Sequence, residues 1–440
     1  MIIGRTESVC PVCLRVLPAE ICPGTDGVYM EKSCPEHGDF RSLIWEGDLR
    51  SYLRWATKNS AAEAPKDPRP CDRGCPYDCG LCGEHRTKGC CVLLELTKRC
   101  NLRCPVCFAS AGETGDGDPS LGQIAAQYQY LMDHGGPFNI QLSGGEPTVR
   151  DDLPEIIALG REKGFSFFQL NTNGLRLASE PGYARRLKQA GLSTVFLQFD
   201  AVSDPVYQVL RGRRLLGEKE RAIGACAEAG LGIVLVPVIA AGVNEDQVGP
   251  ILRYALERMP AVRGVHFQPL SYFGRCGLDR PERPVTIPKM LRLIEEQTEG
   301  RMRASDFGGG GAENPYCSFH ASYLKKTDGS LKALKRRAED GCCCISSDDS
   351  RQAVASQWSG ETEDFADDGE FLETSSLDAF LEQARKNTFA VSGMVFQDAW
   401  NLDLKRLRRC YICEMDPEYG MVPFCAYNLT DTEGRALYRK

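Results

Sequence analysis

The sequence lacks an excess of basic residues, since 53 Lys and Arg stand against 60 Asp and Glu for a formal net charge of −7. That charge argues against nucleic acid as a partner, because proteins that bind a phosphate backbone carry basic surfaces. The sequence also lacks a continuous apolar run of about eighteen residues, the length of a transmembrane helix. Its first residues, MIIGRTESVCPVC, lack the basic and apolar regions of a secretory signal. These absences predict a cytoplasmic protein without a transmembrane segment.

Cysteine, in contrast, is abundant, with 22 residues in a chain of 440. A reducing cytosol disfavours disulfides, and close CxxC spacings favour metal ligands. Scattered buried thiols are the alternative, and that description suits Cys226 and Cys276. It does not suit most of the other cysteines, which gather in a few short segments. The chain is therefore expected to hold several metal centres.

Six short apolar runs in the middle of the chain alternate with amphipathic segments. They are VLLELT (92–97), NIQLS (139–143), FFQLNT (167–172), TVFLQFD (194–200), GIVLVPVI (232–239) and VHFQPL (265–270). Apolar strands that alternate with helices are typical of a parallel sheet covered by helices. The pattern predicts an α/β fold, a partial (β/α)6 TIM-like barrel, although a doubly wound open sheet would give the same order. In both folds the loops after the strands carry the site.

The first of these strands is followed by CNLRCPVCF, which places Cys100, Cys104 and Cys107 at the spacing CxxxCxxC. This segment resembles the signature of the radical S-adenosylmethionine (radical SAM) enzymes, and the resemblance covers residues 92–275. It implies three thiolates holding a 4Fe–4S cluster, whose fourth iron takes the amino and carboxylate groups of S-adenosylmethionine (SAM). Reductive cleavage of SAM then gives a 5′-deoxyadenosyl radical that abstracts hydrogen. A zinc knuckle is the alternative, but three cysteines leave a closed tetrahedral site incomplete.

Motifs at the next strand ends agree with this resemblance. GGEP, within LSGGEP (142–147), looks like the family segment that receives the methionine amino group, and its glycines allow close approach of a ligand. NTNG (171–174), the end of TVFLQFD and VPV (236–238) resemble segments that contact the ribose and the adenine. The resemblance thus predicts SAM contacts from Gly144, Gly145, Glu146, Pro147, Asn171, Asn173, Gln198, Asp200 and Val236.

Near the N-terminus, CPVC (10–13) and CPEHG (34–38) bracket a segment that alternates like a hairpin. The natural ligands of one tetrahedral ion there are Cys10, Cys13, Cys34 and His37. Cys22 is spare and could replace His37. The ion is either zinc or a single rubredoxin-like iron, since sulfur-rich tetrahedral sites accept both. Because a segment of about fifty residues hardly builds its own core, the metal is expected to stabilise it.

A second CxxxCxxC spacing precedes the barrel, where Cys75, Cys79 and Cys82 lie in GCPYDCGLC. A second iron–sulfur cluster is the favoured interpretation; a zinc site and extra ligands to the first cluster are the alternatives. With the N-terminal motif and the closing RRCYIC…MVPFCAYN, this segment resembles one radical SAM subgroup nearly end to end. That subgroup includes the archaeal tetraether lipid synthase and class D methyltransferase-like proteins that were linked to methylation of a pterin.

The remaining cysteines lie in the last third of the chain. Ligands for a further closed cluster are predicted to be Cys317, Cys410, Cys413 and Cys425. A zinc ribbon is the alternative there, and the triplet Cys342, Cys343 and Cys344 could also donate a ligand. The regions expected along the chain are a metal domain (1–55), an auxiliary cluster segment (66–91), the barrel (92–275) and an auxiliary iron–sulfur region (276–440).

The resemblance implies an enzyme that abstracts hydrogen from an unactivated carbon and forms a C–C bond. Joining of lipid tails is the favoured reaction, and methylation of a pterin-like heterocycle or a peptide is the alternative. An apolar tunnel would indicate the first and polar donors in the pocket the second. An external electron donor such as flavodoxin or ferredoxin is expected, and peripheral contact with a membrane is left open. No catalytic side chain is assigned, because the cofactor is the abstracting agent.

Overall fold

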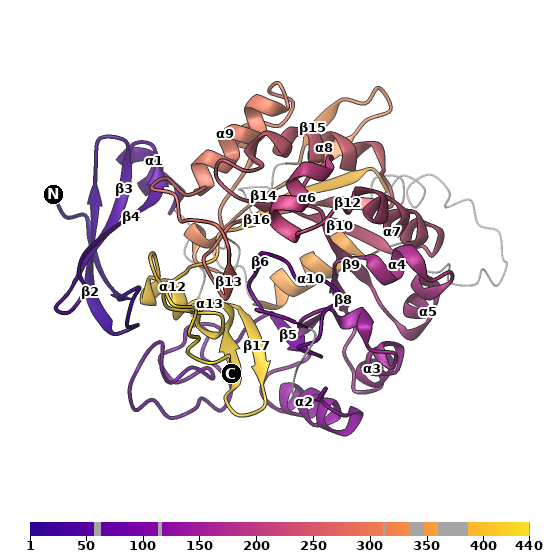
Figure 1. The fold of residues 1–440 in the computed structure, drawn as a ribbon, viewed down its shortest axis with the longest axis horizontal. Coiled ribbons are helices and arrows are strands. Elements are labelled where there is room, and N and C mark those ends of the chain that lie inside the picture. Colours follow the sequence, from indigo (N-terminus) through magenta and orange to yellow (C-terminus); the bar gives the residue numbers. More distant parts are fainter. Residues whose placement is uncertain (57–62, 113–116, 311–312, 335–346, 360–385, 440) are drawn as a thin grey trace, which may run out of the picture.

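A four-stranded antiparallel sheet forms the N-terminal region of the computed structural model, which describes residues 1–56, 63–112, 117–310, 313–334, 347–359 and 386–439. In spatial order it contains β1 (Gly4–Val9), β2 (Val16–Pro23), β3 (Gly27–Cys34) and β4 (Gly38–Glu46), and α1 (Leu49–Trp55) follows. The sheet stands at one side of the molecule (Figure 1). Two cysteine-containing turns, after β1 and after β3, lie at the same end of this sheet because neighbouring strands are antiparallel.

A larger sheet forms the body of the molecule. Its central strands match the six apolar runs: β5 (Cys91–Glu95), β7 (Asn139–Ser143), β8 (Phe168–Thr172), β9 (Thr194–Gln198), β10 (Gly232–Val236) and β12 (Val262–Pro269). They pair in that order and all run parallel. Short strands β6 (Val106–Cys107), β11 (Val238–Ile239) and β13 (Arg275–Cys276) lie in the loops at their carboxyl ends. The α/β partial barrel expected from the sequence is confirmed.

Helices cover the outer face of this sheet (Figure 1). They are α2 (Leu121–Asp133), α3 (Leu153–Glu162), α4 (Leu175–Ser179), α5 (Tyr183–Ala190), α6 (Asp204–Arg211), α7 (Leu216–Glu228), α8 (Val248–Glu257) and α9 (Ile287–Gln297). Most have an apolar stripe that packs into the main core, as in α3, where Leu153, Ile156 and Ile157 are fully buried. The apolar side of α6 packs instead in a separate cluster with Leu102 and Val106 of the cysteine loop. None of the helices in the described ranges has the length and apolar character to span a bilayer.

The C-terminal region extends the barrel sheet at both edges. Beside β12 lie β16 (Thr388–Met394), β14 (Ser318–Lys325) and β15 (Leu331–Ala333); beside β5 lie β17 (Ile412–Asp416) and β18 (Gly420–Pro423). Because β16 and β17 are parallel to their neighbours, they continue the barrel rather than forming a separate unit. The short helices α12 (Leu404–Leu407) and α13 (Phe424–Tyr427) flank β17 and β18.

Helix α10 (Ser347–Trp358) lies against the inner side of the barrel near the amino-terminal ends of the strands (Figure 1). The side-chain amide of Asn139, the first residue of β7, donates to the carbonyl of Arg351 at 3.0 Å. At the end of α10 the ring of Trp358 packs against Phe196 of β9, with 4.8 Å between centroids. This helix therefore forms a floor under the barrel, a feature that the sequence did not indicate.

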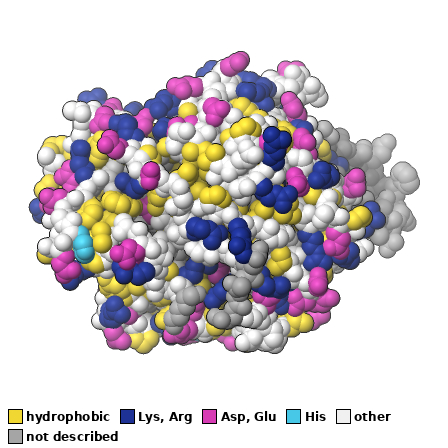
Figure 2. Space-filling view, in the orientation of Figure 1, with side chains coloured by type: hydrophobic (Ala, Val, Ile, Leu, Met, Phe, Trp, Pro, Cys, Tyr) yellow, Lys and Arg dark blue, Asp and Glu magenta, His cyan; other side chains and the backbone are white. Residues whose placement is uncertain are grey.

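The surface seen in Figure 2 carries Lys and Arg side chains interspersed with Asp and Glu. Neither sign dominates this face, in agreement with the small net charge of −7 for 440 residues. Apolar side chains are scattered between the charged ones. On this face the molecule therefore presents no continuous basic stripe of the kind that tracks a phosphate backbone.

Candidate active site and metal centres

A cavity of about 230 Å³ lies at the carboxyl ends of the parallel strands. It is lined by the cysteine loop, by strand ends from β5 to β12, and by C-terminal residues such as Phe396 and Phe424. The lining includes ten of the residues predicted from the sequence, namely Cys100, Cys104, Cys107, Gly144, Gly145, Glu146, Asn171, Asn173, Gln198 and Val236. Two other predicted contacts, Pro147 and Asp200, are buried and do not line it.

The cysteine loop after β5 is held in place by backbone and arginine contacts. Its strand β6 pairs with β13, and Arg275 donates to the carbonyl of Cys104 at 2.9 Å. All three thiols face the cavity from this single loop. Within the described residues, these three thiols do not come close enough together to bind one metal ion. This separation fits an iron–sulfur cluster, because each thiolate of a cluster binds a different iron. The donor set therefore suits a 4Fe–4S cluster with one open iron.

The two glycines of GGEP pack against the segment that leads into the cysteine loop. A Cβ at Gly145 would overlap the carbonyl oxygen of Arg99, and a Cβ at Gly144 would overlap that of Thr97. Gly144 also has φ +123°, which disfavours a side chain. The backbone N–H of Gly145 donates to the Thr97 carbonyl at 2.7 Å. The glycines are thus required by backbone-to-backbone packing as well as by access for a ligand.

Glu146 uses its carboxylate inside the protein. One oxygen accepts from the Thr148 backbone at 3.1 Å and from the hydroxyls of Thr148 and Thr172 at 2.6 and 2.7 Å. The other oxygen accepts from the backbone N–H of Asn173 at 2.7 Å. The side chain is 1% exposed and joins the end of β7 to the end of β8. Glu146 therefore positions the GGEP and NTNG segments.

Asp200 holds a buried arginine that the sequence analysis missed. Its carboxylate accepts from Nε and Nη2 of Arg211 at 2.7 and 2.8 Å, and also from the backbone of Val238. Arg211 reaches the cavity and donates to the carbonyl of Val106 in the cysteine loop at 3.0 Å. Nearby, burial lowers the pKa of Lys219 to about 8, although Asp200 opposes this. Asp200 thus orients a cation beside the cysteine loop.

Polar side chains also line the deeper wall of the cavity. The amide of Asn171 donates to Gln141 at 3.1 Å, and the amide of Gln141 donates to the thiol of Cys91 at 2.9 Å. His266 and Gln268 project from β12 on the same side, two residues apart. Gln141 gives no periodic signal, because it is one polar residue inside the apolar run NIQLS. His266 and Gln268 alternate with Val265 and Phe267, and this period of two could have indicated a strand with a polar face toward the site.

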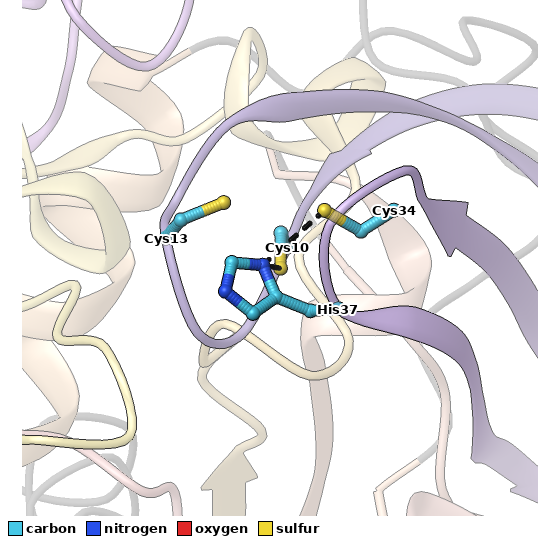
Figure 3. Close-up of side chains that lie close together, drawn as sticks. All are labelled: Cys10, Cys13, Cys34 and His37. Atoms are coloured by element: carbon cyan, nitrogen blue, oxygen red, sulfur yellow. Dashed lines mark hydrogen bonds between the residues drawn. The ribbon is translucent and has the colours of Figure 1, made fainter.

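The N-terminal turns bring their four predicted ligands together. The ligand atoms of Cys10, Cys13, Cys34 and His37 all lie within 4.8 Å of one another (Figure 3). Nδ1 of His37 is 3.6 Å from the sulfur of Cys10 and 3.4 Å from that of Cys34. Although desolvation opposes it, backbone N–H groups of Glu36 and His37 lower the pKa of the Cys34 thiol to about 6. A Cys3His set with a ready thiolate suits a tetrahedral ion.

The segment before the barrel packs against the C-terminal region. Cys75 lies beside Cys79, and Cys71 lies beside Cys82. Tyr438 accepts from the backbone of Cys79 at 2.9 Å and donates to the Pro76 carbonyl at 2.6 Å. Within the described residues, Cys75, Cys79 and Cys82 do not converge on one point as ligands of a single ion would. Their assignment to a second cluster stays a prediction.

Three of the four C-terminal cysteines are neighbours. Cys317, Cys410 and Cys425 lie close enough that, beyond the effect of burial, a negative charge on the thiol of Cys317 raises the pKa of the other two. The sulfur of Cys317 accepts a hydrogen bond from Nη2 of buried Arg406 at 3.4 Å. Cys413 lies on β17 next to Ile412, which lines the cavity, so its side chain points to the opposite face of the sheet. There it packs in the main core and is 0% exposed. The triplet Cys342–Cys344 lies outside the described residues.

Comparisons with known proteins relate the whole chain to one group. A model described as the radical SAM superfamily matches residues 94–255, and one described as the HMPTM N-terminal zinc ribbon domain matches residues 2–46. The chain is 35% identical over 476 aligned positions to 7,8-dihydro-6-hydroxymethylpterin dimethyltransferase of Methanocaldococcus jannaschii, covering 96% of this chain and 93% of that protein.

Other relatives match about half of the chain. GTP 3′,8-cyclase of Staphylococcus aureus is 30% identical over 219 positions, which cover 47% of this chain and 61% of that protein. Among solved structures, Streptococcus suis SuiB bound to S-adenosylmethionine gives a TM-score of 0.40 at 16% identity, covering 48% of this chain and 47% of SuiB.

Proposed function

The chain belongs to the radical SAM superfamily, and we propose that it transfers methyl groups to a carbon of a pterin-like heterocycle. The observation that carries this proposal is the end-to-end similarity to a pterin dimethyltransferase, at 35% identity over 96% of the chain. This similarity takes in both the N-terminal sheet and the C-terminal region, whereas the match to GTP 3′,8-cyclase covers 47% of the chain. Methylation of a pterin was the alternative expected from the sequence.

The enzyme uses a 4Fe–4S cluster and SAM, as its family implies. When bound, they supply a 5′-deoxyadenosyl radical that abstracts hydrogen. The residues proposed to hold them are the thiols of Cys100, Cys104 and Cys107 and the backbone of GGEP. The protein's own contribution is orientation and exclusion of water: Glu146 fixes the loops from below, and Phe424 and Phe396 pack together over the cavity with centroids 4.4 Å apart.

The cavity supports a polar substrate. Gln268 presents its amide to the interior, and a lipid tail would offer that amide no hydrogen bond. A heterocycle with N–H and C=O groups at its edge can bond to it. The joining of lipid tails, favoured from the sequence, has no support from the relatives.

Methylation replaces one hydrogen on the acceptor carbon. With a methyl-level donor the change is R–H + CH3–X → R–CH3 + H–X, which by itself consumes no electrons. With a methylene-level donor, such as a methylene-folate, this change takes two electrons and two protons. Each SAM that is cleaved to methionine and 5′-deoxyadenosine takes a further two electrons and one proton. We assign the supply of these electrons to an external carrier of the flavodoxin or ferredoxin class, and we assign zinc to the Cys3His site of the N-terminal sheet.

The test is anaerobic incubation of the iron-loaded protein with SAM, a reductant, a methylene-folate and 7,8-dihydro-6-hydroxymethylpterin. Mass spectrometry should detect pterin that has gained one or two methyl groups. A parallel reaction contains isotopically labelled phospholipid in place of the pterin. An unchanged pterin together with label joined across two lipid chains would overturn the proposal.

A further inference from the structure

The wall of the cavity formed by β12 and β16 has no assigned role. The residues proposed to contact SAM come from the ends of β7, β8, β9 and β10. His266 on β12 and Met394 on β16 line the adjacent wall. This part of the cavity is therefore left for the second ligand, the substrate.

His266 is the most polar group on that wall, and its orientation is fixed. Nδ1 lies 2.9 Å from the hydroxyl of Ser392, its register partner on β16. Its ring lies 5.8 Å from the ring of Phe196 and 6.0 Å from that of Trp358, measured between centroids. Two aromatic neighbours and one hydrogen bond leave the imidazole little freedom to rotate.

The other ring nitrogen of His266, Nε2, has no hydrogen bond to any of the described residues. Burial lowers the pKa of this imidazole to about 4, so it is neutral at pH 7. A neutral imidazole has one donor and one acceptor, and Ser392 uses only one of them. His266 lines the cavity and is partly exposed there, so Nε2 is open to a ligand that enters the cavity.

The neighbours of His266 indicate the shape of that ligand. Phe196 also lines the cavity, and its ring packs against the ring of Trp358 in α10. An aromatic ring held in this way offers a flat face to a planar ligand. Gln268, two residues along β12, adds an amide that can donate and accept. A planar heterocycle with donors and acceptors on its edge fits this set.

We propose that His266, oriented by Ser392, recognises the edge of the pterin-like substrate through Nε2 while Phe196 contacts the face of its ring. The inference rests on the proposed function and adds specificity residues to it. Adenine is also a planar heterocycle, and Val236, at the end of the neighbouring strand β10, was expected to flank it. The test must therefore measure the binding of the two ligands separately.

The experiment measures the dissociation constants of 7,8-dihydro-6-hydroxymethylpterin and of SAM by anaerobic titration calorimetry on the iron-loaded protein. The variants are His266→Leu, which removes both nitrogens, His266→Asn, which keeps a donor and an acceptor, and Ser392→Ala. His134→Leu is the matched control, because His134 stacks on Tyr130 at the end of α2, away from the cavity. Iron content and thermal unfolding verify that each variant is folded.

His266→Leu is expected to weaken pterin binding by at least about tenfold, with SAM binding changed by less than about twofold. Pterin affinity should fall less in His266→Asn and in Ser392→Ala than in His266→Leu. It should not change in His134→Leu. Equal pterin affinity in the wild type and in His266→Leu would overturn this inference without affecting the proposed function. A His266→Leu variant that binds pterin normally but no longer binds SAM would overturn it as well. If His266→Leu does not fold, Ser392→Ala and His266→Asn decide by the same criteria. A wild-type protein that neither binds nor methylates the pterin would overturn the proposed function itself.

Discussion

Glu146 is buried, and both of its carboxylate oxygens accept hydrogen bonds from the protein around it. A residue that holds two loops together acts on cofactor binding through geometry. From the sequence alone GGEP suggests direct contact with the ligand, since a motif does not reveal where a carboxylate points. The same is true of Asp200, whose partner is Arg211. At the scale of the residue, the structure places ten of the positions predicted from the sequence at the cavity, and their contacts with SAM and the cluster stay predictions.

Replacing Glu146 with Gln is expected to destabilise the protein by about 2 kcal/mol, because an amide NH2 would face the N–H of Asn173 or the two threonine hydroxyls. SAM affinity should also fall, since the NTNG and GGEP segments lose their common anchor. Urea unfolding and SAM titration are the measurements. Glu155→Gln, on the exposed face of α3, is the matched control and should change neither.

Gly145→Ala is expected to displace the start of the cysteine loop, because the new Cβ would overlap the carbonyl of Arg99. The cost should be about 2 kcal/mol or more in unfolding free energy, together with weaker retention of iron. Gly224→Ala is the control, since a Cβ there meets nothing within 4 Å in the middle of α7. That variant should be neutral or slightly more stable. Equal iron retention in both variants would show that the Gly145 contact is unimportant.

At the scale of the element, the apolar runs located the central strands closely. The run 139–143 coincides with β7, and the run 194–200 contains β9. The strands β16 and β17 escaped detection because their partners, β12 and β5, are far away in sequence. In β17 the buried Glu414 also interrupts the apolar pattern; burial raises the pKa of its carboxyl well above the usual range. Local patterns predict strands, but long-range pairing decides which of them complete a sheet.

The N-terminal sheet should depend on its metal ion. Cys10→Ser combined with Cys34→Ser is expected to abolish metal binding there and to raise amide hydrogen exchange across β1–β4. Exchange should also rise at Thr432, because its backbone N–H donates to the Pro11 carbonyl. Cys22→Ser is the control, as Cys22 lies on β2 outside the ligand set. Unchanged exchange in the double variant would mean that the sheet folds without metal.

At the scale of the whole molecule, the cysteine-containing turns of the N-terminal sheet, the segment before β5 and the C-terminal region contact one another. The segment before β5 contacts the C-terminal region through Tyr438, and the C-terminal strand β17 completes the barrel beside β5. The sequence predicted the separate cysteine groups, since spacing is local. The assignment of Cys413 to a ligand set with Cys317, Cys410 and Cys425 stays a prediction. The alternation of side chains in β17, which sets the face on which Cys413 lies, could not be seen without knowing that this segment is a strand.

Iron content tests the auxiliary clusters. Protein purified without oxygen should carry about twelve irons in three 4Fe–4S clusters, plus one tetrahedral ion of zinc. Elemental analysis with Mössbauer spectroscopy distinguishes cluster iron from adventitious iron. A value near four irons per chain would contradict the prediction of both auxiliary clusters. Only the cluster predicted on Cys100, Cys104 and Cys107 would then be supported.

Methyl transfer by radical chemistry is tested most directly by quantifying 5′-deoxyadenosine and methylated pterin in the same anaerobic reaction. The wild type is compared with a variant in which Cys100, Cys104 and Cys107 are all alanine, and with Cys22→Ala/Cys226→Ala as a control outside the predicted ligand sets. We expect both products from the wild type and the control, and neither from the triple variant. Methylated pterin from the triple variant, or 5′-deoxyadenosine from the wild type with no methylated pterin, would contradict the assignment.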